Sequence, residues 1–272
     1  MEEQNNAAAV SSIDRYAAII LALDKSGSMS GKQALVYQTI TEYLRMMAKL
    51  NETSLDFEYR VLLLTFDSAV NVINPDGQPL PPQYLLEMFE DGDYVCSGGT
   101  SLAAVFRKID SLFSRKAGGL LEHARKGDAA PTVIYISDIV PTDKQTEYNS
   151  AKKLLLSNRY YEATKRLCVF LGPESKRSAA AELVGSSENV LAMGEGDQNL
   201  EELLLPILWG SSIMMADGSH ISGEQSSGDL AREQKERAEL GKESAENLKD
   251  FTDPLELEEE LKKLFKLTEG GA

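Results

Sequence analysis

The feature that most constrains the fold is an uninterrupted apolar run near the start of the chain, residues 16–23 (YAAIILAL). A strand with one face in water alternates apolar and polar residues, whereas a continuous apolar run is typical of a strand buried on both faces. Two later segments have the same character, 58–66 (EYRVLLLTF) and 132–137 (TVIYIS). Strands of this kind need helices over both faces of their sheet, and they therefore predict a parallel sheet in an α/β domain.

Apolar residues recur at helical spacing between these strands. We expect helices at 32–50, 101–115, 145–157, 176–184 and 198–211, further strands at 68–73, 166–171 and 189–192, and a turn-rich loop at 75–82. Strands that alternate with helices over this length predict a doubly wound, Rossmann-like and mostly parallel sheet. Ligands of such sheets bind at the carboxyl ends of the strands, near the point where the strand order reverses.

Composition divides the chain into one domain and an extension. We expect a disordered N-terminal tail at 1–14, the α/β domain at 15–211, a linker at 212–228 and an acidic, partly helical extension at 229–272. From residue 217 onward there are 15 acidic and 8 basic residues.

Within the extension, 253–267 has the clearest helical pattern. Pro254 fits the first helical position. Leu257, Leu261, Leu264 and Phe265 follow at positions i, i+4, i+7 and i+8. This apolar stripe either docks on the chain's own domain or binds a partner.

Charge and cysteine content exclude several classes of function. The net charge of −15 and the pI near 4.7 argue against nucleic acid as a partner, because phosphate binding needs clustered Lys and Arg. The same charge disfavours anionic membranes. The chain has no apolar stretch of ~18 residues and no signal-peptide pattern, so we expect a cytoplasmic protein without a membrane span. Cys96 and Cys168 have no metal-ligand spacing and make a poor disulfide framework.

An oxygen-rich turn follows the first apolar run. Asp24, Ser26 and Ser28 occupy alternate positions of this turn, so their side chains can converge on one point. One carboxylate and two hydroxyls are hard oxygen donors of the type that Mg²⁺ takes, and Mg²⁺ commonly uses only one or two carboxylates. The alternative is that one of the serines caps the following helix.

Two further polar segments lie at the ends of predicted elements. Thr100 closes the sequence CSGGT directly before the helix at 101–115, and Asp138 directly follows the strand at 132–137. A carboxylate is costly inside a core, so Asp138 is expected at the exposed end of its strand. Taken singly, Thr100 could be a helix cap and Asp138 a turn residue. Three such loops in this order are far less expected by chance than any one of them. Together they predict one divalent-metal site.

These residues resemble the metal-ion-dependent adhesion site of von Willebrand factor A (vWA) domains. The resemblance is carried by Asp24-x-Ser26-x-Ser28, by Thr100 in SGGT and by Asp138 in SDIVPTD. It implies that Ser26 and Ser28 bind the metal directly, that Thr100 binds directly or through water, and that Asp24 and Asp138 act through water. The implied ion is Mg²⁺, with Mn²⁺ or Ca²⁺ as alternatives, and an open coordination position accepts a carboxylate from a partner protein.

The resemblance therefore predicts a non-enzymatic adaptor that binds an Asp or Glu of a protein partner. The elements SGGT, PTD and LGPESKRSAAAELVG also resemble bacterial TerY-type stand-alone vWA proteins, which belong to tellurite-resistance and related stress systems with kinase and phosphatase partners. One departure concerns Ile139, which stands where many relatives have Gly. This substitution puts the shape of the loop after Asp138 in question.

Two other functions are compatible with these residues. An aspartate after a strand is also typical of Mg²⁺-dependent phosphohydrolases with an aspartyl nucleophile, although Ser26 stands where such enzymes carry a second acid. The chain contains no GxSxG elbow, P-loop or HExxH sequence. The third function is a scaffold in which the metal only stabilises the fold.

The remaining polar residues are expected to have structural roles. Asp67 follows the second strand, and Asp143 is expected to cap the helix at 145–157. Cys96 has no neighbouring basic cluster that would lower its pKa. His123 and His220 are isolated and are not expected to be bases or ligands.

Overall fold

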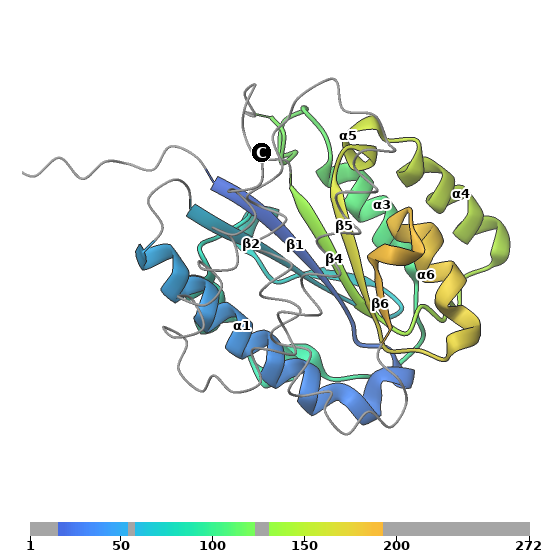
Figure 1. Cartoon of the computed structure of the whole chain (residues 1–272), viewed down its shortest axis with the longest axis horizontal. Helices are drawn as coiled ribbons and strands as arrows, with labels where there is room; N and C mark the ends of the chain where they lie inside the picture. Colours follow the sequence, from blue (N-terminus) through green and yellow to red (C-terminus); the bar gives the residue numbers. More distant parts are fainter. Residues whose placement is uncertain (1–15, 54–57, 123–130, 193–272) are drawn as a thin grey trace, which may run out of the picture.

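A computed structural model describes residues 16–53, 58–122 and 131–192 of the chain. Figure 1 shows a central twisted sheet with helices on both sides. The expected tail at 1–14, the helix at 198–211, the linker at 212–228 and the extension at 229–272 lie outside the described residues.

The sheet has six strands in the order β3-β2-β1-β4-β5-β6. The strands are β1 (Tyr16–Asp24), β2 (Glu58–Phe66), β3 (Val70–Val72), β4 (Thr132–Ser137), β5 (Lys165–Phe170) and β6 (Val190–Ala192). All neighbouring pairs are parallel except β2 and β3, which are antiparallel. The sequence-based prediction of a Rossmann-like, mostly parallel sheet is confirmed.

Six α-helices and five 3₁₀-helices connect the described strands. The α-helices are α1 (Gln33–Thr53), α2 (Pro82–Met88), α3 (Leu102–Leu112), α4 (Gln145–Leu156), α5 (Arg159–Glu162) and α6 (Arg177–Val184). The 3₁₀-helices are η1 (Gly27–Lys32), η2 (Pro75–Gly77), η3 (Asp91–Tyr94), η4 (Glu174–Lys176) and η5 (Ser187–Asn189).

The alternating side chains of the buried strands supply two hydrophobic layers. On β1, Ile19 and Leu21 belong to the layer that packs against α1 and α2, whereas Ile20 and Ala22 belong to the layer that packs against α3, α4 and α6. Figure 1 shows α1 on one side of the sheet and α3, α4 and α6 on the other. This two-sided burial is the physical reason for the continuous apolar run at 16–23.

The strand order reverses between β1 and β4. The connection from β1 leads through α1 to β2 on one side of β1, whereas β4 pairs with the other side. Asp24 is the last residue of β1, and Asp138 directly follows β4. Both candidate ligands therefore lie at the carboxyl edge at the switch point, where open α/β sheets bind ligands. None of the helices in the described ranges has the length and apolarity needed to cross a bilayer.

Candidate metal centre

The first loop holds Asp24, Ser26 and Ser28 against the end of β1. Asp24 Oδ1 accepts a hydrogen bond from the backbone N–H of Ser26 (2.9 Å). Ser26 Oγ and Ser28 Oγ are 3.1 Å apart. Ser26 precedes η1, but its side chain makes no capping hydrogen bond there, so the alternative of a simple serine cap is wrong. Asp24 and Ser26 are buried, whereas Ser28 is exposed, and the loop therefore opens to solvent at Ser28.

The second loop places Thr100 just before α3. Ser101, not Thr100, is the N-cap of this helix, and its hydroxyl accepts a hydrogen bond from the Ala104 N–H (3.3 Å). Thr100 is 2 % exposed, and among the described residues its hydroxyl forms no hydrogen bond. Its backbone instead pairs with Thr142: the Thr100 N–H donates to Thr142 Oγ1 (3.0 Å), and the Thr142 N–H donates to the Thr100 carbonyl (2.9 Å). The Thr100 hydroxyl is therefore available to a ligand.

Glycine is required in this loop because the third loop packs directly against it. A Cβ on Gly99 would lie 2.6 Å from Thr142 Oγ1, which is closer than real Cβ atoms approach. Gly98 has a positive φ of 70°, which L side chains rarely adopt.

The third loop carries Asp138 at the end of β4. Asp138 Oδ1 accepts a hydrogen bond from the Val140 N–H (3.2 Å), an Asx turn that matches the alternative considered from the sequence. Among the described residues, no hydrogen bond reaches the other carboxylate oxygen. Ile139 has a positive φ of 51° and a buried side chain. A glycine adopts this φ without strain, whereas a β-branched residue such as Ile rarely adopts it.

Hydrogen bonds join the three loops into a closed ring. The Gly27 N–H donates to the Gly98 carbonyl (3.1 Å), which links the first loop to the second. The Thr100–Thr142 pairing links the second loop to the third. The Ser137 hydroxyl donates to Asp24 Oδ2 (2.5 Å), which links β4 back to β1. The structure therefore places the loops that carry all five predicted residues side by side at one sheet edge.

Burial sets the electrostatics of the site. Desolvation raises the pKa of Asp24 from 3.8 to about 6, hydrogen bonds from Ser137 and Ser26 oppose this shift, and the nearby Asp138 adds to it. No ion pair among the described residues involves Asp24 or Asp138. Two neighbouring, buried carboxylates without a cationic side chain favour a bound cation, since isolated buried charges are otherwise costly.

The donor set fits a hard divalent cation. With Mg–O distances of about 2.1 Å, two ligands at adjacent corners of a magnesium octahedron lie about 3 Å apart. The spacing of 3.1 Å between Ser26 Oγ and Ser28 Oγ agrees with this value. The described residues contain no cluster of three or more His, Cys, Asp and Glu side chains, so the available ligands are hydroxyls with two carboxylates. Oxygen-only donors favour Mg²⁺, Mn²⁺ or Ca²⁺.

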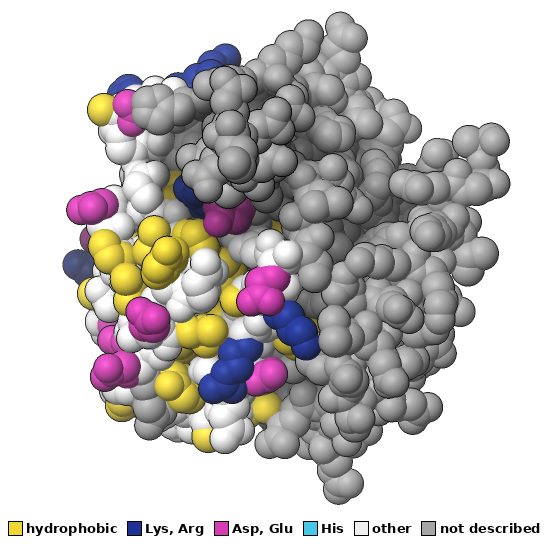
Figure 2. Space-filling view, turned by 90° about the vertical axis from the view of Figure 1, so that its left-hand side faces the viewer, with side chains coloured by type: hydrophobic (Ala, Val, Ile, Leu, Met, Phe, Trp, Pro, Cys, Tyr) yellow, Lys and Arg dark blue, Asp and Glu magenta, His cyan; other side chains and the backbone are white. Residues whose placement is uncertain are grey.

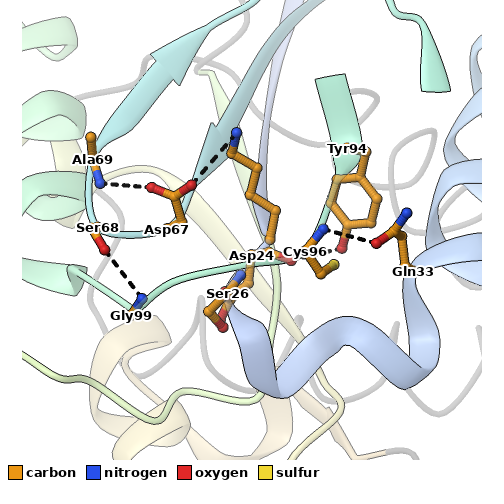
Figure 3. A network of polar contacts seen from close by, with 10 residues as sticks. Asp24, Ser26, Gln33, Asp67, Ser68, Ala69, Tyr94, Cys96 and Gly99 are labelled. Atoms are coloured by element: carbon orange, nitrogen blue, oxygen red, sulfur yellow. Dashed lines mark hydrogen bonds and ion pairs between the residues drawn. The ribbon is translucent and has the colours of Figure 1, made fainter. Parts of the chain in front are cut away.

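A second group of side chains supports the loops without belonging to the donor set. Lys25 forms an ion pair with Asp67 (3.6 Å), and the Gly99 N–H donates to Ser68 Oγ (3.1 Å). Figure 3 shows these contacts on one side of Asp24 and Ser26, with Gln33, Tyr94 and Cys96 on the other. Asp67 therefore has the structural role expected of it.

Tyr94 and Cys96 attach the segment before the second loop to β1 and α1. The Tyr94 hydroxyl donates to the Asp24 carbonyl (2.7 Å), and the Cys96 N–H donates to the Gln33 side chain (2.8 Å). Burial raises the pKa of the Cys96 thiol to about 11, in agreement with the absence of an activating basic cluster. Cys168 is fully buried in β5.

The prediction for Asp143 is wrong. Its carboxylate accepts hydrogen bonds from the Ser101 hydroxyl (2.7 Å) and the Ala103 N–H (2.9 Å), so it caps α3 rather than α4. Helix α4 begins after Lys144 without a side-chain cap. Because the second and third loops pair with each other, Asp143 lies at the start of α3 and does not cap α4, the helix that follows it in the chain.

Sequence reasoning did not identify Ser137, Tyr94 and Thr142. Each of them acts on a residue far away in the chain, and local patterns carry no signal for that. Ser137 lies beside Asp24 because Leu23 of β1 pairs with Ile136 of β4, a register that the structure shows and the sequence pattern does not.

Sequence comparisons give no match, neither to a protein-family model nor to a curated protein. Comparison with solved structures gives 228 matching chains. The pilus adhesin SpaC from Lactobacillus rhamnosus GG, in an open conformation, is 12% identical, with 74% of this chain and 30% of that chain covered and a TM-score of 0.55.

Two more solved structures have similar coverage. The proximal thread matrix protein 1 from the mussel byssus, described with a zinc occupied MIDAS motif, is 16% identical over 72% of this chain and 48% of that chain, with a TM-score of 0.50. A von Willebrand factor type A protein from Catenulispora acidiphila is 16% identical over 73% of this chain and 43% of that chain, with a TM-score of 0.49. The chain spans less than half the length of each of these three proteins. At such identities the likeness to the adhesin and the matrix protein shows the fold alone, a Rossmann-like α/β fold.

Proposed function

We propose that this chain is a metal-dependent protein-interaction module, in which Asp24, Ser26, Ser28, Thr100 and Asp138 hold Mg²⁺. Ser26 and Ser28 would be direct ligands, Thr100 a direct or water-mediated one, and the two aspartates water-mediated ones. The ion would supply an open coordination position for an Asp or Glu of a partner protein. The proposal follows the vWA resemblance of the sequence.

The observation that carries the proposal is the pair of buried carboxylates, which has no cationic partner among the described residues and lies beside two serine hydroxyls 3.1 Å apart. Ser28 is exposed, so a partner can reach the site. Binding is favoured over phosphoryl transfer because Asp24 is fully buried and both of its carboxylate oxygens accept hydrogen bonds. An attacking aspartate needs a free oxygen facing its substrate.

Metal binding is tested by titrating Mg²⁺ into the full chain under calorimetric observation. We expect saturable binding, together with an increase in the free energy of unfolding of about 2.7 kcal/mol at 100 times the Kd. The variant Ser26→Ala/Ser28→Ala should lose both effects. Ser30→Ala is the matched control, because Ser30 is an exposed serine of the same 3₁₀-helix and is outside the donor set. Equal Mg²⁺ binding by the wild type and the double variant would contradict the proposed site.

The interaction role is tested by affinity capture with and without chelator. We expect partners that are retained in Mg²⁺ and lost in EDTA, and that the Ser26→Ala/Ser28→Ala variant does not capture. If the metal only stabilised the fold, the variant would melt earlier but would still capture the same partners below its melting temperature.

We further propose a cytoplasmic adaptor role in a bacterial stress system, with a kinase or phosphatase as the partner. The support is the likeness of the SGGT, PTD and LGPESKRSAAAELVG elements to TerY-type proteins. Chelator-sensitive capture of a kinase or phosphatase would support this assignment, and chelator-sensitive capture restricted to other classes of protein would contradict it.

A further inference from the structure

Exposed hydrophobic side chains gather on the segment that leads into the metal loops. Tyr84 and Val95 are each 50% exposed and Met88 is 38% exposed. These are three of the six large hydrophobic side chains that are exposed among the described residues, and we call them the α2–η3 ridge. The face of the molecule in Figure 2 shows hydrophobic side chains with charged ones between them. A chain segment that exposes several large apolar side chains is a candidate interaction site.

The ridge is continuous with the candidate metal centre. The Phe89 ring, next to Met88, packs against Tyr37 with ring centroids 5.3 Å apart. One turn earlier on α1, Gln33 accepts a hydrogen bond from the N–H of Cys96, next to Val95. Because residues four apart in a helix are separated by about 6 Å along its axis, the residues next to Met88 and Val95 are both fixed to α1 within one turn.

The charges of the chain segment that carries the ridge are of one sign. Residues 61–106 contain no Lys or Arg and include six acidic residues. Glu87, Glu90 and Asp93 belong to this stretch, and among the described residues none of them forms an ion pair. A segment that fits here must therefore be apolar on one face and basic beside it.

We propose that the α2–η3 ridge receives residues 256–266 of this same chain, a segment outside the described residues. Its charges run in the order that the surface requires. The carboxylates Glu256, Glu258, Glu259 and Glu260 come first, followed by Leu261, Leu264 and Phe265 with the lysines Lys262, Lys263 and Lys266. In this arrangement the acidic end of the segment faces the metal loops. Its apolar stripe packs on the ridge, and its lysines lie beside Glu87 and Glu90.

The other exposed apolar pair, Leu154 and Leu156 on α4, has Lys153 beside it, and the neighbouring Lys152 already pairs with Glu182. Only the placement of the acidic end rests on the proposed metal function; the contact with the ridge does not need the metal.

The test is methyl NMR on the full chain with labelled Met and Leu methyl groups. We expect NOEs from the Met88 methyl to the methyl groups of Leu261 or Leu264, both in EDTA and in Mg²⁺. The variant Leu261→Glu/Leu264→Glu should lose these NOEs and shift the Met88 signal, whereas the signals of the buried Met46 and Met47 should stay in place. Leu154→Glu on α4 is the matched control and should leave the NOEs unchanged.

Charge reversal gives a second measurement. Lys262→Glu/Lys263→Glu should weaken the Met88 NOEs, and adding Glu87→Lys should restore part of their intensity. The proposal is overturned if the NOEs are absent in both EDTA and Mg²⁺, or if Leu261 and Leu264 contact Leu154 or Leu156 instead. Failure of the metal site would show separately, as the absence of Mg²⁺ binding with the Met88 NOEs intact.

Discussion

At the scale of single residues, Asp24 is an ionisable carboxylate in a buried position that disfavours its charged form. It is fully buried at the end of β1, and burial raises its pKa to about 6. The folded state therefore binds its proton more tightly than the unfolded state, whose Asp has a pKa near 3.8. Without metal, the ionised Asp24 destabilises the fold. This cost is absent below about pH 4, grows as the pH rises through the window from 4 to 6, and is complete above it.

Replacing Asp24 by Asn removes this pH-dependent cost. In EDTA, Asp24→Asn should be more stable than the wild type by about 2 kcal/mol at pH 8, since a shift of one pKa unit corresponds to about 1.4 kcal/mol and one hydrogen bond must rearrange. At pH 4 the difference should disappear or reverse. Urea unfolding at the two pH values measures it. A variant that is less stable than the wild type by the same amount at both pH values would contradict the assigned pKa.

Ile139 adopts a backbone conformation that β-branched residues rarely take. Its buried side chain compensates for the strain, so removing the side chain should destabilise the protein in any case. The informative comparison is between two truncated variants. Ile139→Gly should be more stable than Ile139→Ala by about 1 kcal/mol, the reverse of the usual order, because Gly adopts a positive φ without strain. Urea unfolding of the pair checks this, and a less stable Gly variant would show that the strain is negligible.

The five candidate ligands could be predicted because each of them follows or precedes an element with a strong apolar pattern. Asp24 and Asp138 come after continuously buried strands, and Thr100 comes before a helix with a clear apolar stripe. Ser137, Thr142 and Asp143 could not be assigned correctly, since their partners are set by which strands and loops become neighbours. The hydrogen bond of Ser137 spans 113 residues of the chain, that of Thr142 spans 42, and the two of Asp143 span 42 and 40.

At the scale of elements, the strands and the helices α1, α3, α4 and α6 agree with the sequence pattern, whereas α2, α5 and the 3₁₀-helices were not predicted. β1, β2 and β4 match their apolar runs closely. Helix α2 lies largely beyond the loop expected at 75–82 and was not predicted, because its seven residues are too few to show a helical repeat. The 3₁₀-helices were missed for the same reason. Packing fixes the position of η1, whose Met29 is buried, but η2 and η4 have no buried residue.

Asp143 couples helix α3 to the third loop. It accepts two hydrogen bonds at the first turn of α3, while the adjacent Thr142 pairs with Thr100. Asp143→Ala should therefore lower the free energy of unfolding by about 1–2 kcal/mol through loss of the cap. It should also weaken Mg²⁺ binding, because the Thr100 loop loses part of its support. Glu147→Ala, in the first turn of α4, is the control.

Chemical denaturation and calorimetric Mg²⁺ titration separate these two effects. A loss of stability without any change in Mg²⁺ affinity would mean that Thr100 is held by its pairing with Thr142 alone.

At the scale of the whole molecule, charge is distributed unevenly along the chain. The described residues contain 17 of the 28 Lys and Arg and 19 of the 43 Asp and Glu, so most of the net charge of −15 lies outside them. A nearly neutral domain attached to strongly acidic segments carries its own source of carboxylates for any bound cation. The attachment raises the effective concentration of those carboxylates well above that of an external partner.

Docking of residues 256–266 and metal binding are then linked, and linkage is reciprocal. If the carboxylates at 256–260 reach the metal edge, Leu261→Glu/Leu264→Glu should weaken Mg²⁺ binding several-fold, because it releases the segment without touching a ligand. Conversely, Mg²⁺ should strengthen the Met88 NOEs of the wild type. Calorimetry on the full chain compares the two affinities, with Leu154→Glu as the control. If the wild type and the Leu261→Glu/Leu264→Glu variant bind Mg²⁺ equally well while the wild type shows the Met88 NOEs, the segment rests on the ridge without supplying a carboxylate to the metal. An external acidic partner then meets no internal competitor for the metal.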